Sequence, residues 1–528
     1  MSEHLRALVV ILGLALPVFW IARRVLCPAV IDTADFARRR NLWLGITLAA
    51  FLSHNYWLFL IVASVLVLWS ANPQRERNPM ALFFFVLFAV PAFDGTLPGL
   101  GGIQTLFAVN HPRFLALLVL LPAAIRLSLD PVTPRLGRYP ADWFLLGYLA
   151  LQAALYFGAA TITQTMRASF YLMVDTLLLY YVASRSVVTL RGFQDLAASL
   201  GVALLVVALV AIFEFGKHWL LYSSLSTALG LQWDAGLYLG RESLLRAVGP
   251  AGHSLVLGYV LAVGLGLWLC LRPRVSPLAW WTGIVALCAG LIAPVSRGPW
   301  VGAAIIVVVA AATGQRAGSR ITKLLMASLV TVLLVVASPF GERLVEFLPF
   351  VGSVDEYNVT YRSRLFQVSL TVIAQNPLLG SADFRSNPEM EQMRQGQGII
   401  DLVNSYVGIA LSSGLVGLLL FAAVFSACLW GAYRAMRSAG SASAETELLG
   451  RSLFAALCGV LVMIAAVSSI LAIPTIYWSL AGLAVAYSAM VKRGSAVSAG
   501  VSSTTGAAPR FFSGQSDVVA ARQRRGGG

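Results

Sequence analysis

Charged residues are scarce in this chain. Of its 528 residues only 12% are Asp, Glu, Lys or Arg, whereas 58% are hydrophobic, and the mean hydropathy is +0.79. A soluble domain carries roughly 25% charged residues, so no water-soluble fold would hide this much apolar surface. The composition excludes a soluble enzyme and indicates a polytopic membrane protein. Unbroken rather than alternating apolar runs argue against an outer-membrane β-barrel.

Cysteine and histidine are also rare, with five of each. The cysteines show no C-x-x-C spacing, so neither a metal site nor a disulfide framework is indicated. The sequence has no Gly-rich P-loop, no G-x-G-x-x-G after a strand and no H-E-x-x-H. ATP hydrolysis and metal-dependent proteolysis therefore lack support, and we expect no cofactor. The energy for any reaction must come with the substrate.

Apolar runs dominate what is present. A membrane-spanning helix needs about 20 mostly apolar residues, and the candidate runs are 5–22, 41–53, 56–71, 79–92, 113–128, 143–158, 168–184, 196–215, 253–271, 278–294, 299–313, 323–339, 404–430, 452–472 and 475–491. Several are short. The sequence therefore predicts an all-α polytopic integral membrane protein of about 12–15 transmembrane helices.

The net charge of +15 comes from short basic clusters in alternate loops between the runs. This pattern indicates membrane topology and not nucleic-acid binding, because cytoplasmic loops of membrane proteins are enriched in Lys and Arg. It predicts an extracytoplasmic N-terminus, a cytoplasmic C-terminus and a hairpin that turns at Ser53–Asn55. The opposite loops, including the long ones at about 216–252 and 340–403, are then extracytoplasmic.

We predict four regions along the chain. Residues 1–240 form N-terminal transmembrane helices, 241–430 form a core that includes the loop at about 340–403, 431–493 form C-terminal transmembrane helices, and 494–528 form a disordered cytoplasmic tail. Within the long loop, the spacing of apolar residues predicts a helix over 360–375 beside the membrane surface. Asn376-Pro377 would end that helix.

Four arginines lie on the outer side of the predicted spans, against the usual charge bias: Arg246, Arg297, Arg362 and Arg364. A guanidinium group is planar, always charged and suited to two-point binding of phosphate oxygens. Several of them around one cavity would bind a diphosphate. Alternatively, each arginine extends to lipid headgroups or pairs with an acid in the same loop.

Polar residues at the same ends are candidates for catalysis. Asp401 and Asn404 are three residues apart, so on a helix they would share a face. Asp401 is either a carboxylate that accepts a proton or a helix cap. His253, at the start of the run 253–271, is either a base or a structural helix-start residue. Asp175 lies within the run 168–184, where an acid is a functional candidate by default, but the sequence names no partner for it.

Four motifs occur in a fixed order over about 240–420. They are 246–253 before an apolar span, Ser296-Arg297-Gly298-x-Trp300, Tyr361-x-x-Arg364-Leu365-Phe366 leading to the Asn-Pro-Leu-Leu-Gly segment 376–380, and Asn404-Ser405-Tyr406 leading to the Ser-Gly-Leu-Val-Gly-Leu segment 413–418. Their order and spacing resemble the O-antigen ligase/polymerase superfamily of bacterial envelope glycosyltransferases. The predicted helices and the large loop before the last three are similar to that family as well.

The resemblance implies an inner-membrane enzyme whose donor is a glycan on undecaprenyl diphosphate. The arginines would hold the diphosphate while an acceptor hydroxyl attacks the anomeric carbon with inversion and without a metal. The implied partners are the lipid-linked oligosaccharide, a glycan or lipid acceptor, membrane lipids and other polysaccharide-assembly proteins, with no nucleic acid.

One departure from the family guides the choice among functions. Family ligases carry a His just before the Asn of the last motif, whereas this chain has Asp401-Leu402-Val403 before Asn404. The resemblance implies that this His activates the acceptor hydroxyl as a base, and Asp401 is the nearest residue in this chain that could take its place. The departure favours a polymerase of exopolysaccharide or O-antigen repeats. The alternatives are a ligase that transfers glycan to lipid A-core or protein, and a flippase or transporter of lipid-linked oligosaccharide.

Overall fold

The computed structural model describes residues 2–72, 74–99, 105–159, 161–231, 240–241, 244–314, 317–336, 356–394, 400–439 and 443–505. The first part of the chain forms α1 (Glu3–Leu26), α2 (Thr33–Leu52), α3 (Tyr56–Ser70), α4 (Pro79–Val86), α5 (His111–Leu115), α6 (Leu121–Leu129), α7 (Pro140–Ala159), α8 (Ile162–Leu172), α9 (Leu179–Ser186), α10 (Leu190–Lys217) and α11 (Ser223–Ala228). Two π-helical segments, η1 (Ala116–Leu120) and η2 (Met173–Leu178), continue α5 into α6 and α8 into α9.

The second part of the chain forms α12 (Ser254–Trp268), α13 (Pro277–Ile292), α14 (Arg297–Ala312), α15 (Ala317–Val336), α17 (Glu356–Gln375), α18 (Pro388–Glu391), α19 (Ser405–Ala439), α20 (Ala444–Met463) and α21 (Ile473–Thr505). Short 3-10 turns lie at Gly249–Ala251, Leu269–Leu271 and Phe384–Ser386. Two small antiparallel hairpins pair β1 (Asp94–Pro98) with β2 (Thr105–Asn110), and β3 (Gly240–Arg241) with β4 (Leu244–Leu245).

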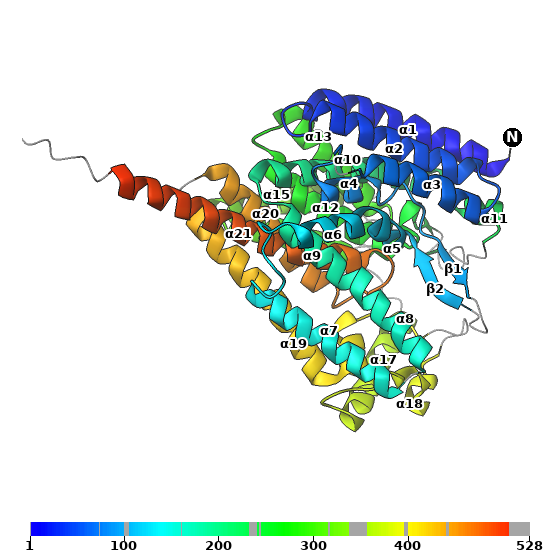
Figure 1. The fold of residues 1–528 in the computed structure, drawn as a ribbon. Helices are drawn as coiled ribbons and strands as arrows, with labels where there is room; N and C mark the ends of the chain where they lie inside the picture. Colours follow the sequence, from blue (N-terminus) through cyan, green and yellow to red (C-terminus); the bar gives the residue numbers. More distant parts are fainter. Residues whose placement is uncertain are drawn as a thin grey trace, which may run out of the picture.

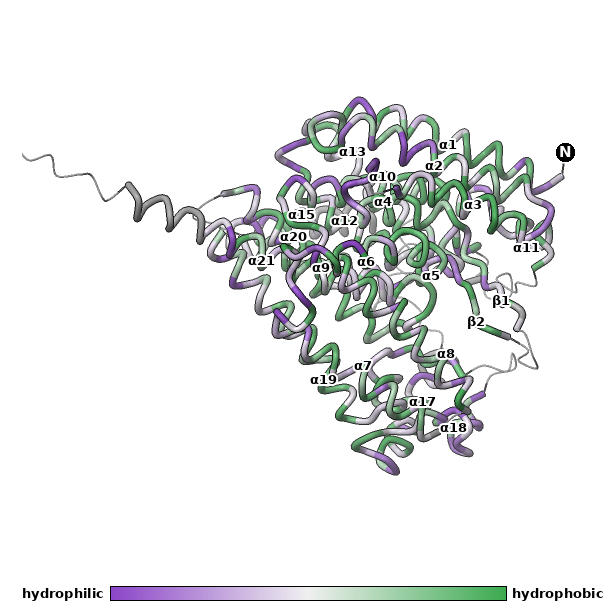
Figure 2. The backbone as a smooth tube through the Cα atoms, viewed as in Figure 1, coloured by the Kyte–Doolittle hydropathy of each residue, from purple (hydrophilic) through white to green (hydrophobic). Residues whose placement is uncertain are grey.

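The helices confirm the predicted fold class, an all-α polytopic membrane protein. Each of the fifteen apolar runs contains a helix. By length and composition, seven helical segments in the described part of the chain are able to cross a membrane, and three shorter apolar helices accompany them. Hydrophobic residues dominate the helices, while hydrophilic ones gather toward helix ends and connections (Figure 2). The total of 12–15 spans stays a prediction.

The helix bundle has two ends (Figure 1). The end at which α12, α14 and α19 begin and α20 ends is called the cavity end, after the cavity described below. At the opposite end α2, α4, α7 and α10 begin, and α21 continues away from the bundle toward Thr505; this end carries Arg38, Arg39, Arg185 and Arg191 and is called the arginine-rich end. The helix α21 thus extends beyond residue 494, where we expected the tail to begin. The rest of the predicted tail, 506–528, lies outside the described residues.

Helix α12 lies at the centre of the main hydrophobic core. Nearly all of its side chains are buried, and it packs against α10, α13, α14 and α20. Gly258 allows a close approach to α14, because a Cβ atom there would lie 2.9 Å from Pro299 at the start of that helix. The first turns of α12 and α14 therefore lie directly against each other at the cavity end.

One predicted span is wrong in its second half. The run 452–472 was expected to be a single helix, but α20 ends at Met463 and residues 464–472 form a non-helical loop that leads to α21. Two serines explain the break, since the hydroxyl groups of Ser468 and Ser469 hydrogen-bond to the segment that begins α19. Leu471 adopts a left-handed backbone with φ 49°, which a helix excludes.

The described part of the long loop has a small core of its own. The helix predicted over 360–375 is confirmed by α17, which ends at Gln375, just before Asn376-Pro377. Side chains from α17, the 3-10 turn at Phe384–Ser386, α18, the residues after α18, and α19 form this core, namely Leu365, Val372, Phe384, Met390, Met393 and Leu411. Figure 1 shows α17 and α18 beside the first half of α19. Residues 340–355 and 395–399 of the predicted loop lie outside the described residues.

Candidate functional site

Arg246 is held against the turn between α13 and α14. Its Nε donates to the carbonyl oxygen of Pro294 at 3.0 Å, and its Nη2 donates to the hydroxyl of Ser296 at 2.7 Å. The backbone N–H of Ala247 also donates to the carbonyl of Ala293 at 3.1 Å. These bonds bring together two predicted motifs, 246–253 and Ser296-Arg297-Gly298, that are about fifty residues apart in sequence. Arg246 therefore lies next to the turn that carries Arg297.

The turn that presents Arg297 is a backbone outlier. Val295 has φ 48°, a left-handed conformation that is a genuine exception for a β-branched side chain. Such outliers persist only where the surroundings impose them, and they cluster at functional sites. Here the imposed geometry starts α14 at Arg297, whose side chain is half-buried. The first turn of α14 lies close to the loop after α20, since a Cβ atom at Gly298 would lie 3.7 Å from Ala466.

The buried side chain of Glu214 holds residues 248 and 249 of the motif 246–253 in place. The Glu214 carboxylate, near the end of α10, accepts hydrogen bonds from the backbone N–H groups of Val248 at 3.0 Å and Gly249 at 2.8 Å. It also accepts one from Leu221. Sequence reasoning missed Glu214, although an acid within an otherwise apolar run is a signal of this kind. Its role in the structure is to shape the segment between Arg246 and His253.

His253 caps the N-terminus of α12. Its Nδ1 accepts a hydrogen bond from the backbone N–H of Leu255 at 3.1 Å, so in the neutral ring the proton is on Nε2. Burial and the nearby Arg246 charge lower the pKa of His253 to about 4, against a smaller raising effect of Asp401. A neutral ring with Nδ1 occupied agrees with the structural alternative for His253, and it leaves an N–H donor rather than a free base.

Asp401 and Asn404 do not share a helix face. Residues 401–404 are non-helical, and α19 begins at Ser405. Asn404 is the cap of α19, because its Oδ1 accepts from the backbone N–H of Tyr406 at 2.9 Å and of Val407 at 3.2 Å. The expectation that Asp401 and Asn404 lie on one helix is therefore wrong. The Asp401 carboxylate is exposed and accepts from the hydroxyl of Ser468 at 3.1 Å.

The loop after α20 holds this segment in place. Besides its bond to Asp401, Ser468 donates to the carbonyl of Leu402 at 2.6 Å. Ser405 donates through its backbone to Ile464 and through its side chain to Val467, at 2.9 and 2.8 Å. Sequence reasoning missed this loop because its two serines lie within an apolar run. Contacts across more than sixty residues leave no signal in local spacing.

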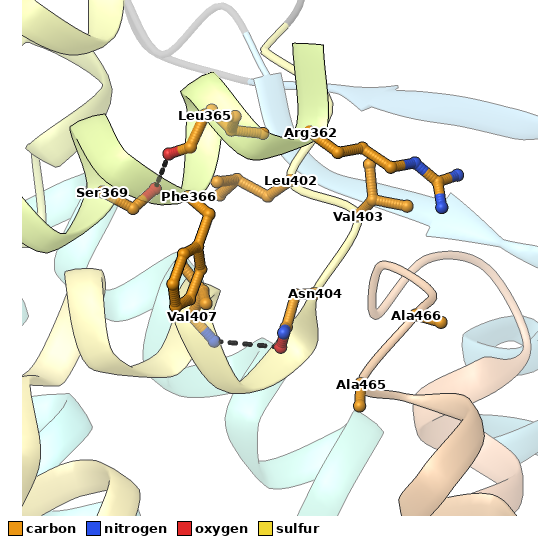
Figure 3. A pocket seen from close by; sticks show the side chains of 10 residues that line it. All are labelled: Arg362, Leu365, Phe366, Ser369, Leu402, Val403, Asn404, Val407, Ala465 and Ala466. Carbon is orange, nitrogen blue, oxygen red and sulfur yellow. Dashed lines mark hydrogen bonds between the residues drawn. The ribbon is translucent and has the colours of Figure 1, made fainter. Parts of the chain in front are cut away.

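These elements enclose a cavity of about 190 Å³ (Figure 3). Helix α17 contributes Arg362 and Phe366, the segment before α19 contributes Val403 and Asn404, and the loop after α20 contributes Ala466. Arg362 extends past Val403, and the Asn404 side chain turns back toward α19. Arg364 is exposed and does not line this cavity. Of the two predicted arginines on α17, the structure therefore brings only Arg362 to the cavity.

Two further segments of the predicted motifs, 376–380 and 413–418, connect the end of α17 to α19 through backbone hydrogen bonds. The backbone N–H groups of Leu415 and Val416 donate to the carbonyls of Pro377 and Leu378, at 2.8 and 3.2 Å. Gly414 makes this possible. Its φ of 65° interrupts the helix, and a Cβ atom there would lie 2.2 Å from the Leu378 carbonyl oxygen. The segments 376–380 and 413–418 thus have a structural role, which is to set the position of Arg362 over the cavity.

Asp175 finds the partner that the sequence did not name. Its carboxylate receives two hydrogen bonds from Arg113, at 3.0 and 2.5 Å. The guanidinium of Arg113 also lies over the ring of Tyr171 and donates to the carbonyl of Ala108 in β2. The pair ties η2 to the β1–β2 hairpin, so a structural role accounts for this intramembrane acid.

No group of three or more His, Cys, Asp or Glu side chains that could hold a metal ion occurs among the described residues.

Comparison with known proteins gives one family. Residues 282–422 match the model of the family described as O-antigen ligase. The matched segment contains Arg297, Arg362, Arg364, Asp401 and Asn404, and it ends before the loop after α20. No curated protein matches the chain. The match supports the resemblance to the O-antigen ligase/polymerase superfamily, and with the apolar helices it indicates a membrane enzyme of the ligase/polymerase type that acts on a lipid-linked glycan and an acceptor.

Proposed function

We propose that the protein is a bacterial inner-membrane glycosyltransferase that polymerises exopolysaccharide or O-antigen repeat units at the periplasmic face. The donor would be a glycan on undecaprenyl diphosphate, and the transfer would be inverting and metal-independent. The observation that carries the proposal is that distant segments lie beside one cavity, which Arg362 lines and Arg246 and Arg297 do not. Arg246 bonds to the turn that precedes Arg297, and a Cβ atom on the residue after Arg297 would lie 3.7 Å from Ala466, which also lines the cavity.

The arginines suit a diphosphate. Arg246, Arg297 and Arg362 come from three segments and are always charged at physiological pH. Charge-assisted hydrogen bonds to phosphate oxygens are about twice as strong as neutral ones, and they strengthen as the leaving diphosphate gains charge. We assign these three arginines to the diphosphate. Arg364, which is exposed outside the cavity, is left without a direct role in this proposal.

Asp401 is the proposed base. The acceptor oxygen would form the new glycosidic bond while the bond between the anomeric carbon and the diphosphate oxygen breaks. The hydroxyl proton would pass to the Asp401 carboxylate, and the diphosphate would leave with its lipid. The Ser468 hydroxyl orients that carboxylate. His253, with its proton on Nε2, is proposed as a donor near the diphosphate, and Asn404 positions the start of α19.

The topology belongs to the same proposal. The arginine-rich end would face the cytoplasm because of the charge bias, which places the N-terminus and the cavity on the periplasmic side and the C-terminus in the cytoplasm. The donor lipid then lies in the membrane beside the site. Acceptor glycans and other polysaccharide-assembly proteins are the proposed partners.

A ligase that transfers glycan to lipid A-core or protein is the second candidate, favoured by the description of the matched family. The two functions differ only in the acceptor. A flippase is less well supported, because the catalytic candidates gather at one end of the bundle rather than along a path through it.

The test uses purified protein with an undecaprenyl-diphosphate-linked repeat unit and no other acceptor. Products are separated on a gel or by mass spectrometry. A polymerase gives a ladder of multiples of the repeat, and Arg297→Ala removes the ladder. A matched control is Arg394→Ala, since Arg394 is an exposed arginine of the long loop at about 340–403 and pairs with Glu391. Transfer only after addition of lipid A-core or protein would make the enzyme a ligase. No turnover of the native repeat by either route would contradict the proposal.

A further inference from the structure

A polar cavity lies at the arginine-rich end, and it shares no lining residue with the proposed catalytic cavity. It measures about 700 Å³ and opens between the start of α2, the segment before α4 and the start of α10. Four arginines line it, Arg38, Arg75, Arg77 and Arg191, together with three aspartates, Asp32, Asp35 and Asp195. Nothing in the proposed transfer reaction uses this cavity.

The aspartates of the cavity are engaged with the protein itself. Asp35 pairs with Arg38 at 2.7 Å. Asp195 pairs at 2.6 Å with Arg39, which is fully buried and also bonds to Glu76 at 2.8 Å. Asp32 accepts a hydrogen bond from the backbone of α2 as its cap. This network forms the floor of the cavity, in which four carboxylates face the two arginines Arg38 and Arg39.

The other three arginines of the cavity outweigh the net negative charge of this floor and leave the site with a small positive excess. Arg75, Arg77 and Arg191 are exposed, and within the described ranges none of them forms an ion pair. The cavity also receives the positive ends of α2, α4 and α10, which begin at its wall. The site therefore presents three exposed guanidinium groups above a polar floor, one of which, Arg191, also donates to the carbonyl oxygen of Pro28 at 3.4 Å. Exposed guanidinium groups of this kind bind phosphate.

Neighbouring aromatic residues place the cavity at the depth of lipid headgroups. The Arg75 guanidinium lies 4.6 Å from the ring centre of Trp69, whose side chain is 63% exposed. At the end of α1, Arg24 lies 3.7 Å from the ring of Trp20, which is 57% exposed. Exposed tryptophans mark the membrane–water interface, and basic pockets between helices on the cytoplasmic side bind anionic headgroups.

We propose that this cavity is a binding site for the phosphate headgroup of an anionic phospholipid, with Arg75, Arg77 and Arg191 as the ligands. Bound lipid would join α2, α4 and α10 at the arginine-rich end. The assignment is independent of the reaction at the cavity end.

The experiment measures lipid binding by the full-length protein in zwitterionic detergent, with native mass spectrometry and titrated dioleoyl phosphatidylglycerol. Dioleoyl phosphatidylcholine is the reference lipid. We expect Arg75→Gln/Arg77→Gln/Arg191→Gln to bind phosphatidylglycerol about a hundredfold more weakly, since each basic side chain near an anionic lipid contributes about fivefold. The matched control is Arg126→Gln/Arg135→Gln/Arg138→Gln, which removes three exposed arginines of the same end that do not line the cavity. We expect the control to bind as the wild type does.

Three results would overturn the proposal. They are unchanged binding by the cavity variant, an equal loss in the control variant, and equal binding of the two lipids by the wild type. A parallel titration with inorganic phosphate separates the sources of the phosphate group. Displacement of the lipid at comparable phosphate concentrations would assign the site to a soluble phosphate compound instead. If the triple variant does not fold, Arg191→Gln alone is tested, with an expected loss of about fivefold.

Discussion

The two ends of the bundle use arginine in different ways. At the arginine-rich end, Arg39 and Arg185 are fully buried and each is bonded to carboxylates, Arg39 to Glu76 and Asp195, and Arg185 to Asp142 at 2.6 Å. At the cavity end, Arg246 is half-buried and bonds to a carbonyl and a hydroxyl oxygen. Both of these oxygens are neutral, and they orient the guanidinium group.

The difference separates arginines that hold the fold from arginines proposed to hold a substrate. A buried ion pair contributes little net stability, but removal of one partner leaves an uncompensated charge. An arginine fixed by neutral oxygens is oriented before the substrate arrives, and this preorganisation is what makes electrostatic stabilisation effective. The predictions below test whether this division is correct.

The largest expected effect is on stability at the arginine-rich end. Arg185→Ala leaves Asp142 buried and charged, with only the hydroxyl of Tyr180 and nearby backbone groups to compensate. We expect the variant to lose about 3–5 kcal/mol of unfolding free energy, measured by thermal denaturation in detergent. The double variant Arg185→Met/Asp142→Leu should recover much of that loss. If Arg185→Ala melts as the wild type does, the pair does not hold the fold.

The corresponding change at the cavity end is expected to remove activity and keep the fold. Arg246→Ala should lower turnover of the lipid-linked donor about 10²–10³-fold, as loss of one preorganised charge-stabilising group does. Its melting temperature should stay close to that of the wild type. A variant that unfolds as readily as Arg185→Ala would erase the distinction between the two ends.

A smaller effect concerns the pH dependence of stability. His253 has a pKa of about 4 in the folded protein, below the usual value of about 6.5. Between these values the unfolded chain binds more protons, so stability is complete above about pH 6.5 and falls as the pH is lowered toward 4. We expect this residue to account for about 1–3 kcal/mol of that fall.

His253→Asn is the matched variant for this prediction. Asparagine is a good helix cap but does not titrate, so unfolding curves of the variant should fall less steeply between pH 6.5 and 4 than those of the wild type. Identical pH profiles would show that His253 is not the group that titrates.

The smallest expected effect concerns the cap of α19. Asn404→Ala removes the acceptor for two backbone N–H groups and should cost about 1 kcal/mol of stability. Asn404→Asp, which can still cap the helix, should cost less. The measurement is thermal denaturation of both variants, and an equal loss in the two would argue against the cap.

The sequence predicted local features well and distant contacts poorly. The apolar runs and the helix that Asn376-Pro377 ends were predictable because hydropathy and helix-stop signals are local. The break after Met463 was not, since Ser468 and Ser469 look like ordinary residues of an apolar span until their hydrogen bonds to Leu402 and Ser405 are seen.

The candidate site shows the same limit. The four arginines could be selected from their position against the charge bias, yet nothing in the sequence distinguishes Arg362, which lines the cavity, from Arg364, which does not. Likewise, Asp175 lacked a partner because Arg113 is 62 residues away along the chain. Pairings of this kind depend on how helices pack against each other, and the spacing of residues within one helix does not reveal which other helix it contacts.

The most direct test of the central claim is the dissociation constant for undecaprenyl diphosphate, measured with protein in lipid nanodiscs. The wild type is compared with Arg246→Ala, Arg297→Ala and Arg362→Ala, and Arg394→Ala is the control. The account predicts binding at least about tenfold weaker in each of the first three variants, as expected for the loss of one charge-assisted contact, and no change in the control. Equal binding by all five proteins would show that these arginines do not hold the diphosphate.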